Sequence, residues 1–165
     1  MIQNIPIFVK YFGSIRRRTF IYARTIPPDQ IDWSPKADEF SCAAILWHLA
    51  AAENMFVGEM ATGEWHYYEP EHESDTSLEE ILSRLKVNHQ EAMATLQTLD
   101  DEVLFQPHPT LNGPETKGWR LMMAIVEHEV HHRSQLAVYL SLMGVEPPQI
   151  FGLKLEEIIE ITSEH

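Results

Sequence analysis

Apolar residues recur at helical spacing in four long segments of the chain, and polar residues fill the opposite faces of the same segments. The segments lie at about Asn4–Thr25, Ser41–Ala61, Ser77–Leu96 and Gly118–Met143. No stretch shows the strict alternation of apolar and polar residues that a half-buried strand would need. The pattern therefore predicts an all-α fold in which four long helices share one core.

Residues at the ends of these segments have the chemistry of helix caps. Asn4 can cap the first helix, and Pro6 is tolerated in its first turn. Ser77 and Glu80 form the pattern of a capping box, which predicts that the third helix begins at Ser77. Gly144 can end the fourth helix by adopting a left-handed conformation.

Two of the connections between the predicted helices are long for a compact domain, which is typical of functional loops. They read TGEWHYYEPEHESDT and DDEVLFQPHPTLNGPETKG, and their aromatic residues are expected to pack over one end of the bundle. The tail LKLEEIIEI has the pattern of a short amphipathic helix. We predict one domain, residues 1–165, that forms a four-helix bundle with long crossover loops and a short C-terminal helix.

Charge and cysteine content narrow the possible partners and compartments. The formal net charge of -13 argues against nucleic-acid binding, because an acidic surface repels a phosphate backbone. Arg16, Arg17, Arg18 and Arg24 are concentrated near the start and are expected on the solvated face of the first helix. Cys42 stands alone among apolar residues, so we expect a small buried residue and a reducing compartment. Without a signal-peptide pattern or a membrane-spanning stretch, we expect a cytoplasmic protein that does not bind membranes.

The fourth segment contains the pattern H-E-x-x-H, formed by His128, Glu129 and His132. Residues four apart lie only about 40° apart around a helix, so both histidines occupy one face. Leu121, Ile125 and Tyr139 fall on the same face, which points both imidazoles into the bundle. Because buried polar groups need partners, the pair is either held by carboxylates and water or bound to a metal ion, and we favour the metal.

A third histidine, His48, lies midway along the second segment in the stretch CAAILWHLAAAENMF. Its face carries mostly small residues, which suggests open space beside the imidazole. Directed at the pair on the fourth helix, it would complete a site of three histidine ligands. Such a site leaves a zinc-like ion one open position for water or substrate, as catalytic sites do.

The remaining histidines are weaker candidates. His131 lies at the edge of the apolar stripe, where it could support a ligand or be exposed. His89 is near the core face of the third helix, and we expect a structural role for it. His66, His72 and His108 lie in the loops and are expected to be solvated.

Three further residues are candidates for a catalytic or supporting role. Glu129 and Glu53 are the acids nearest to the histidines in sequence, although charged helical residues of this kind are typically solvated. Gln135 is better placed, because it falls on the histidine face one turn after His132. A metal ion at the site could ionise a bound water for hydrolysis or a bound thiol for group transfer.

The stretch LWHLAAAENMF, followed far downstream by HEVHHRSQLAVYLSLMGVEPP, resembles the DinB-like (DinB/YfiT) superfamily of metal-binding four-helix bundles. Ser134 stands where members of that family typically have glycine. The resemblance implies that His48, His128 and His132 bind a divalent ion, often zinc or nickel. Characterised relatives include thiol-dependent S-transferases and isomerases, whereas others are described as metal-dependent hydrolases. The resemblance also implies a homodimer, a small-molecule substrate, a low-molecular-weight thiol as co-substrate, and a link to stress responses.

Two other functions stay open at this point. A zinc metallopeptidase would use Glu129 as its base and Glu156 or Glu157 as its third ligand. That enzyme would also need strands to hold an extended peptide, and it would leave His48 without a role. Alternatively, the chain is a non-catalytic metal-binding protein of a stress response. The pattern does not identify the metal, the thiol or the substrate.

Overall fold

The computed structural model describes residues 2–68 and 76–163, and it confirms the all-α prediction. The five α-helices are α1 (Ile5–Ala23), α2 (Cys42–Thr62), α3 (Leu78–Gln97), α4 (Gly118–Leu142) and α5 (Leu155–Ser163). Two short 3-10 helices, η1 (Pro28–Gln30) and η2 (Asp101–Phe105), lie in the connections. The strands β1 (Pro107–His108) and β2 (Thr116–Lys117) pair antiparallel and only close the loop before α4.

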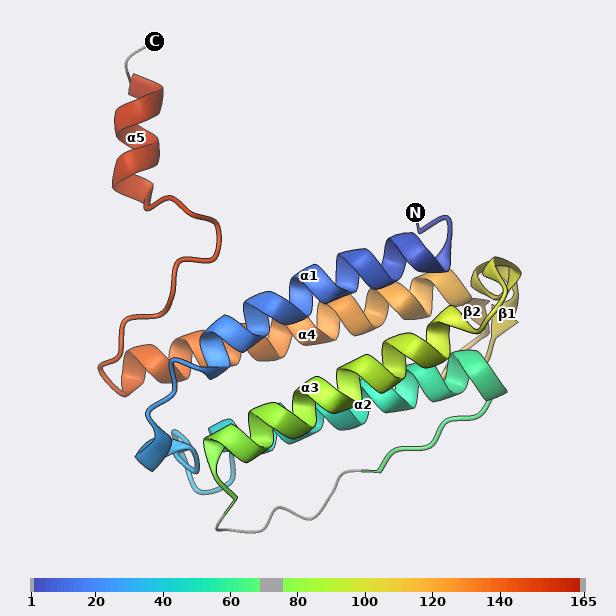
Figure 1. Ribbon diagram of the computed structural model, residues 1–165, viewed down its shortest axis with the longest axis horizontal. Coiled ribbons are helices and arrows are strands. Elements are labelled where there is room, and N and C mark those ends of the chain that lie inside the picture. Colours follow the sequence, from blue (N-terminus) through green and yellow to red (C-terminus); the bar gives the residue numbers. More distant parts are fainter. Residues whose placement is uncertain (1, 69–75, 164–165) are drawn as a thin grey trace.

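The four long helices form a bundle in which α1 and α2 are diagonal to each other (Figure 1). Each of these two helices packs against both α3 and α4. In Figure 1, α1 and α4 run in one direction, and α2 and α3 run in the other. Because α2 and α3 are parallel neighbours, the chain between them has to return along the length of the bundle. This connection is a crossover, as predicted, whereas α3 ends and α4 begins at the same end of the bundle, so the second long loop is not a crossover (Figure 1).

The helix ends follow the chemistry expected of their capping residues. The Asn4 side chain accepts a hydrogen bond from the Ile7 amide at 2.9 Å, and the Ser77 hydroxyl accepts one from the Glu80 amide at 3.2 Å. The second half of the capping box does not form, because the Glu80 carboxylate pairs with Arg84 four residues later. Gly144 has a φ of 77°, the left-handed conformation predicted after α4.

The core consists of two apolar clusters, one toward each end of the bundle. One cluster contains Cys42, which is fully buried as predicted. Between the clusters lies a layer of buried or half-buried polar residues that takes one residue or more from each long helix. This polar layer is Arg16, Glu53, His89, Glu129, His132 and Arg133, and the first and fourth helices supply three of its charges. The expectation that Arg16 is solvated was wrong, because its side chain is 1 % exposed and paired with acids from α2 and α4.

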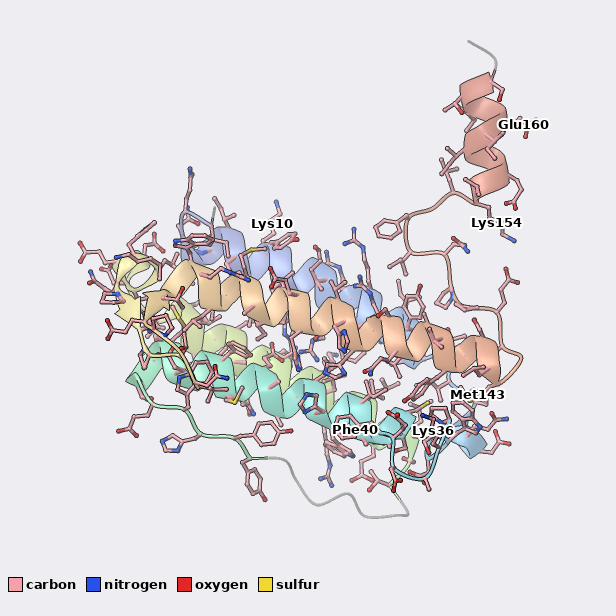
Figure 2. The ribbon with its side chains drawn as sticks, turned by 180° about the vertical axis from the view of Figure 1, so that it is seen from behind. Lys10, Lys36, Phe40, Met143, Lys154 and Glu160 are labelled. Atoms are coloured by element: carbon pink, nitrogen blue, oxygen red, sulfur yellow. The ribbon has the colours of Figure 1, made fainter. Side chains whose placement is uncertain are left out.

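The C-terminal segment stands away from the bundle. Helix α5 confirms the predicted short amphipathic helix, but none of its residues is buried. Figure 2 shows Lys154 and Glu160 beyond the end of the four packed helices. No helix in the described ranges is long and apolar enough to cross a membrane.

Candidate metal centre

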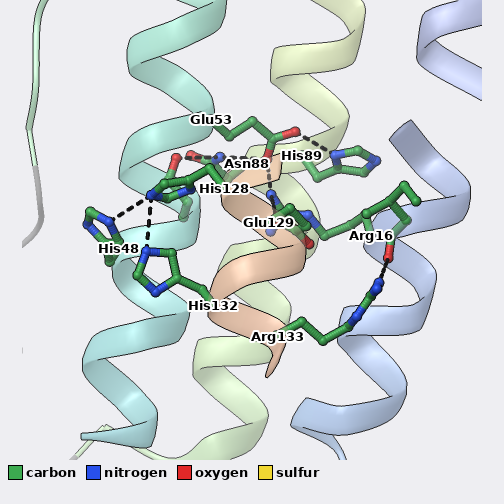
Figure 3. A network of polar contacts seen from close by, with 11 residues as sticks. Arg16, His48, Glu53, Asn88, His89, His128, Glu129, His132 and Arg133 are labelled. Carbon is green, nitrogen blue, oxygen red and sulfur yellow. Dashed lines mark hydrogen bonds and ion pairs between the residues drawn. The ribbon is translucent and has the colours of Figure 1, made fainter. Parts of the chain in front are cut away.

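His48, from the middle of α2, meets His128 and His132 from α4 midway along the bundle, between these two helices (Figure 3). The Nε2 atom of His128 lies 2.9 Å from Nε2 of His48 and 3.1 Å from Nε2 of His132. One ring nitrogen from each of the three residues falls within a span of 4.8 Å. The structure thus brings together the three residues that the sequence pattern singled out.

The outer nitrogens of two rings are held by neighbouring side chains. Nδ1 of His132 lies 2.6 Å from Oε1 of Gln135, and Nδ1 of His48 lies 2.7 Å from the Tyr67 hydroxyl. An amide oxygen only accepts, so His132 donates from Nδ1 and keeps a lone pair on Nε2. Contacts of this kind fix the tautomer and orientation of metal-binding histidines. The predicted importance of Gln135 thus has a geometric basis, namely the orientation of His132.

The electrostatics of the cluster favour neutral imidazoles. Burial, followed by His132, His48, His131 and Arg16, lowers the pKa of His128 to about 3. Burial also lowers the pKa of His132, although its bond to Gln135 acts in the opposite direction. Both rings are therefore neutral at pH 7 and carry lone pairs that can bind a cation.

The geometry fits a divalent metal ion. Tetrahedral coordination with metal–nitrogen distances of about 2.0–2.1 Å places the nitrogens about 3.3 Å apart. The two Nε2 separations of 2.9 and 3.1 Å are close to that value. A cation among the three rings could be bound by one nitrogen lone pair from each of them. These three residues could therefore hold a metal ion.

The surroundings of the cluster are aromatic and partly open. His48 and His128 are half-buried, and His132 is 8 % exposed. The Phe40 ring lies 5.4 Å from the His48 ring, measured between centroids. His131 is exposed, and its ring centroid lies 5.0 Å from that of His132. Tyr67 was not identified from the sequence. It lies in a loop, 19 positions after His48, and helical periodicity does not predict which loop residue contacts a helix.

Glu53 and Glu129 were expected to be solvated, and this was wrong. They are 0 % and 1 % exposed, and Nη2 of Arg16 lies 2.8 Å from Glu53 Oε2 and 3.2 Å from Glu129 Oε2. Nδ1 of His89 lies 2.6 Å from the other oxygen of Glu53. The charges are buried because each has a partner from another helix, a relation that one helix's periodicity does not reveal. Both carboxylates thus take part in buried polar contacts with Arg16 (Figure 3).

His108 was also expected to be solvated, and the structure corrects this. Its side chain is 6 % exposed, with Nδ1 3.0 Å from Glu59 Oε1 and Nε2 2.9 Å from the Val103 carbonyl. The loop before α4 packs so closely here that a Cβ on Gly118 would lie 2.4 Å from the Val103 oxygen. His66 is exposed as expected, and His72 lies outside the described residues.

The structure does not assemble the site of a metallopeptidase. Glu156 and Glu157, the acids proposed as a third ligand, lie on α5, which stands away from the helices α2 and α4 that carry the histidines (Figure 1). Glu129, which would be the catalytic base of a metallopeptidase, pairs with Arg16 in the core. Within the described ranges, the only strands are the two-residue pair β1 and β2. His48, which a peptidase would leave unused, is part of the cluster.

The Gln135 contact leads to a testable expectation. Gln135→Ala should weaken metal binding by about 10- to 100-fold, the usual effect of removing a group that orients a metal-binding histidine. Competition with a chromogenic chelator would measure the affinity. Ser134→Ala, which changes the neighbouring exposed position, is the matched control and should bind as the wild type does. Equal affinities for both variants would show that the Gln135 bond does not support the site.

The lowered pKa of His128 predicts how the metal-free protein responds to acid. The unfolded chain takes up a proton near the ordinary value of 6.5, whereas the folded chain does so only near 3. Protons therefore favour the unfolded state in this window, and stability should fall as the pH drops from about 6.5 toward 3. Urea unfolding at a series of pH values would measure the trend. A His128→Gln variant should lose less stability over that range, and an identical loss would contradict the assignment.

Comparison with known proteins agrees with the observed fold. The Bacillus subtilis protein YjoA is 25 % identical over 138 residues, which cover 82 % of this chain and 88 % of YjoA. The crystal structure of YjoA, described as DinB-like, superposes with a TM-score of 0.68 and covers 86 % of this chain and 95 % of its own. A DinB-like protein from Bacillus cereus, 17 % identical, has the same fold, with a TM-score of 0.77 over 92 % of this chain and 100 % of its own.

A match to a family profile extends over almost the whole sequence, from residue 1 to residue 162, within α5. The bundle and the placement of the three histidines on α2 and α4 both lie within residues 1–162, the range that the profile covers. The chain belongs to the DinB family.

Proposed function

We propose that this protein is a metal-dependent enzyme that activates a low-molecular-weight thiol for transfer to a small electrophilic substrate. The observation that supports the proposal is the convergence of three Nε2 atoms, at 2.9 and 3.1 Å, at a half-buried position. Three protein ligands are typical of catalytic rather than structural zinc sites, because one coordination position stays available.

Each side chain near the site has a distinct part in the proposal. His48, His128 and His132 would hold the ion through Nε2, and neutral imidazole suits both zinc and nickel. A divalent ion supplies Lewis acidity, which lowers the pKa of a thiol or water bound beside it. Gln135 and Tyr67 fix two of the rings, so the ligands need little reorganisation when the ion binds.

The position of the acids favours a thiol over water as the nucleophile. A hydrolase commonly uses a carboxylate base near the metal, but Glu53 and Glu129 are turned toward Arg16 and buried. A free thiol has a pKa of about 8.5, so it ionises beside a cation without a dedicated base. Because Glu53 and Glu129 are not placed to act as bases, their positions favour thiol transfer over hydrolysis.

A hydrolase is the second candidate, and His131 is the observation in its favour. The ring is exposed and lies 5.0 Å from the His132 ring, so it could accept a proton from an attacking water. Replacing it therefore separates the two chemistries. His131→Ala should slow hydrolysis strongly if water is the nucleophile and should leave thiol transfer nearly unchanged.

The function is tested by offering both types of nucleophile to the metal-loaded protein. Conjugation of 1-chloro-2,4-dinitrobenzene with cysteine, glutathione and other small thiols is compared with hydrolysis of 4-nitrophenyl acetate. We expect conjugation above the uncatalysed rate with at least one thiol, lost in His48→Ala and after chelation. Ester hydrolysis without conjugation would replace the first proposal with the second. Turnover that survives His48→Ala would exclude both.

A further inference from the structure

Helix α5 has an apolar face that nothing in the described structure covers. Leu155, Ile158 and Ile159 follow the i, i+3, i+4 spacing of one helix face and are 67 %, 43 % and 53 % exposed. The acids Glu156, Glu157 and Glu160 occupy the other side. A helix of nine residues is too short to be stable alone in water, so α5 needs a surface to pack on.

A groove of matching character runs between α1 and α3. Two adjoining hollows of about 480 and 400 Å³ share Phe20, Arg24 and Lys86, so they form one continuous groove. We call it the α1–α3 groove; its lining includes the apolar side chains of Phe20, Ile21, Leu78 and Leu82. It lies on the side of the bundle opposite the histidine cluster, which α2 and α4 hold.

The charges at this groove oppose those of α5. Arg17, Arg24 and Lys86 are exposed there, and none of them forms an ion pair with another described residue. Among the described residues that line the groove, Glu79 at its far end is the single acid. In a chain with a net charge of -13, such a concentration of unpaired cations is unusual. It suits an acidic helix whose apolar face lies in the groove.

The dimensions of the helix and the groove also match. Nine residues of α5 span about 13.5 Å, at 1.5 Å per residue. The twelve residues from Gly13 to Arg24, which include the part of α1 that lines the groove, span about 18 Å by the same rise. The groove is therefore long enough to hold the whole of α5.

We propose that α5 of one chain docks in the α1–α3 groove of a second copy, and that the exchange is reciprocal. The result is a two-fold symmetric dimer in which each subunit contributes one helix and one groove. This interface does not involve the histidine cluster and is independent of the proposed chemistry.

A second copy is favoured over the same chain by the path of the tail. The tail leaves the bundle past Arg18, whose guanidinium lies 5.5 Å from the centre of the Phe151 ring. Arg18 lies about 100° around α1 from Arg17, on the side of the α4 residue Arg133. The tail thus passes on the side of α1 away from its own groove, and Figures 1 and 2 show α5 directed outward.

Light scattering after size-exclusion chromatography tests the proposal on the full-length chain. The wild type should have twice the chain mass of 19.1 kDa. Ile158→Asp should be monomeric, and so should a groove variant that combines Arg17→Glu with Lys86→Glu. Each change should raise the dimer dissociation constant at least ~100-fold, because like charges or a buried carboxylate would face the partner. Val138→Asp, at an exposed apolar position of α4, is the matched control and should stay dimeric.

Reversing the charges of α5 in one variant and of the α1–α3 groove in another distinguishes this dimer from other arrangements. An α5 variant that combines Glu156→Lys with Glu160→Lys should be monomeric alone, as should the groove variant. Mixed together, the two should form a heterodimer, since each helix then meets a groove of opposite charge. Circular dichroism would confirm that every variant is folded. A monomeric wild type, dimers that persist in the variants, or no recovery on mixing would each overturn the proposal.

Discussion

His48→Ala is expected to lose the metal ion almost completely. The change removes one of three nitrogens that converge at 2.9 and 3.1 Å, and the two ligands that are left both come from α4. Removing a ligand should lower the metal affinity by more than the roughly 10- to 100-fold that is lost when a residue orienting a ligand is replaced. Metal content of the purified protein, measured by mass spectrometry, and competition with a chelator would both show the loss.

Two controls make the His48 result specific. Glu156→Ala removes an exposed acid of α5 and should retain the metal, and His66→Ala removes an exposed loop histidine with the same expectation. Circular dichroism would establish that His48→Ala remains folded. Metal retained by His48→Ala but lost from Glu156→Ala would favour the metallopeptidase arrangement over the three-histidine site.

Glu53→Ala is expected to destabilise the fold by roughly 3 kcal/mol, the lower end of the range for breaking a buried ion pair. Arg16 and Glu53 are 1 % and 0 % exposed and lie 2.8 Å apart, so the guanidinium would lose its closest acceptor without access to water. His89 would lose its carboxylate partner as well. The remaining contact with Glu129, at 3.2 Å, limits the loss. The free energy of unfolding in urea measures the effect.

An exposed ion pair of the same chain provides the comparison. Glu80 and Arg84 are paired on the surface of α3, with side chains 47 % and 57 % exposed. Glu80→Ala should cost no more than about 1 kcal/mol, because water already screens that pair. If the two substitutions destabilise equally, the polar layer does not contribute to stability as its burial indicates.

The state of Glu129 bears on how the pattern H-E-x-x-H is interpreted. Burial raises the pKa of Glu129, and the nearby Arg16 partly opposes the increase. The carboxylate is engaged with Arg16 in the polar layer while its neighbour His128 points to the cluster. Glu129 thus links α4 to α1 and supports the helix that presents the histidines. The glutamate of the peptidase-like pattern therefore belongs to the polar layer and not to the histidine cluster.

The polar layer and the candidate metal centre occupy the same level of the bundle. His128 and Glu129 are adjacent on α4 but face different neighbours, the first toward α2 and the second toward α1. The next residues repeat this division, because His132 joins the cluster and Arg133 donates to the Ile15 carbonyl at 3.4 Å. One turn of α4 thereby both presents ligands and holds the neighbouring helices.

The sequence by itself determined the helices and one face of each. Periodicity located α1 to α4 within a few residues, since apolar spacing and capping chemistry are local properties. The same arithmetic placed His128, His132 and Gln135 on one face and His48 on a face of small residues. Those statements need only the geometry of a single helix, and the structure agrees with them.

The tertiary structure alone decided which charged residues are buried. Arg16, Glu53 and Glu129 look like surface residues on their own helices, and His108 looks like a loop residue. Each is buried because a partner of complementary charge or hydrogen-bonding capacity comes from a distant segment, as with Arg16 and Glu53, 37 positions apart. The free energy of a buried charge depends on that partner, and one helix's pattern has no information about it.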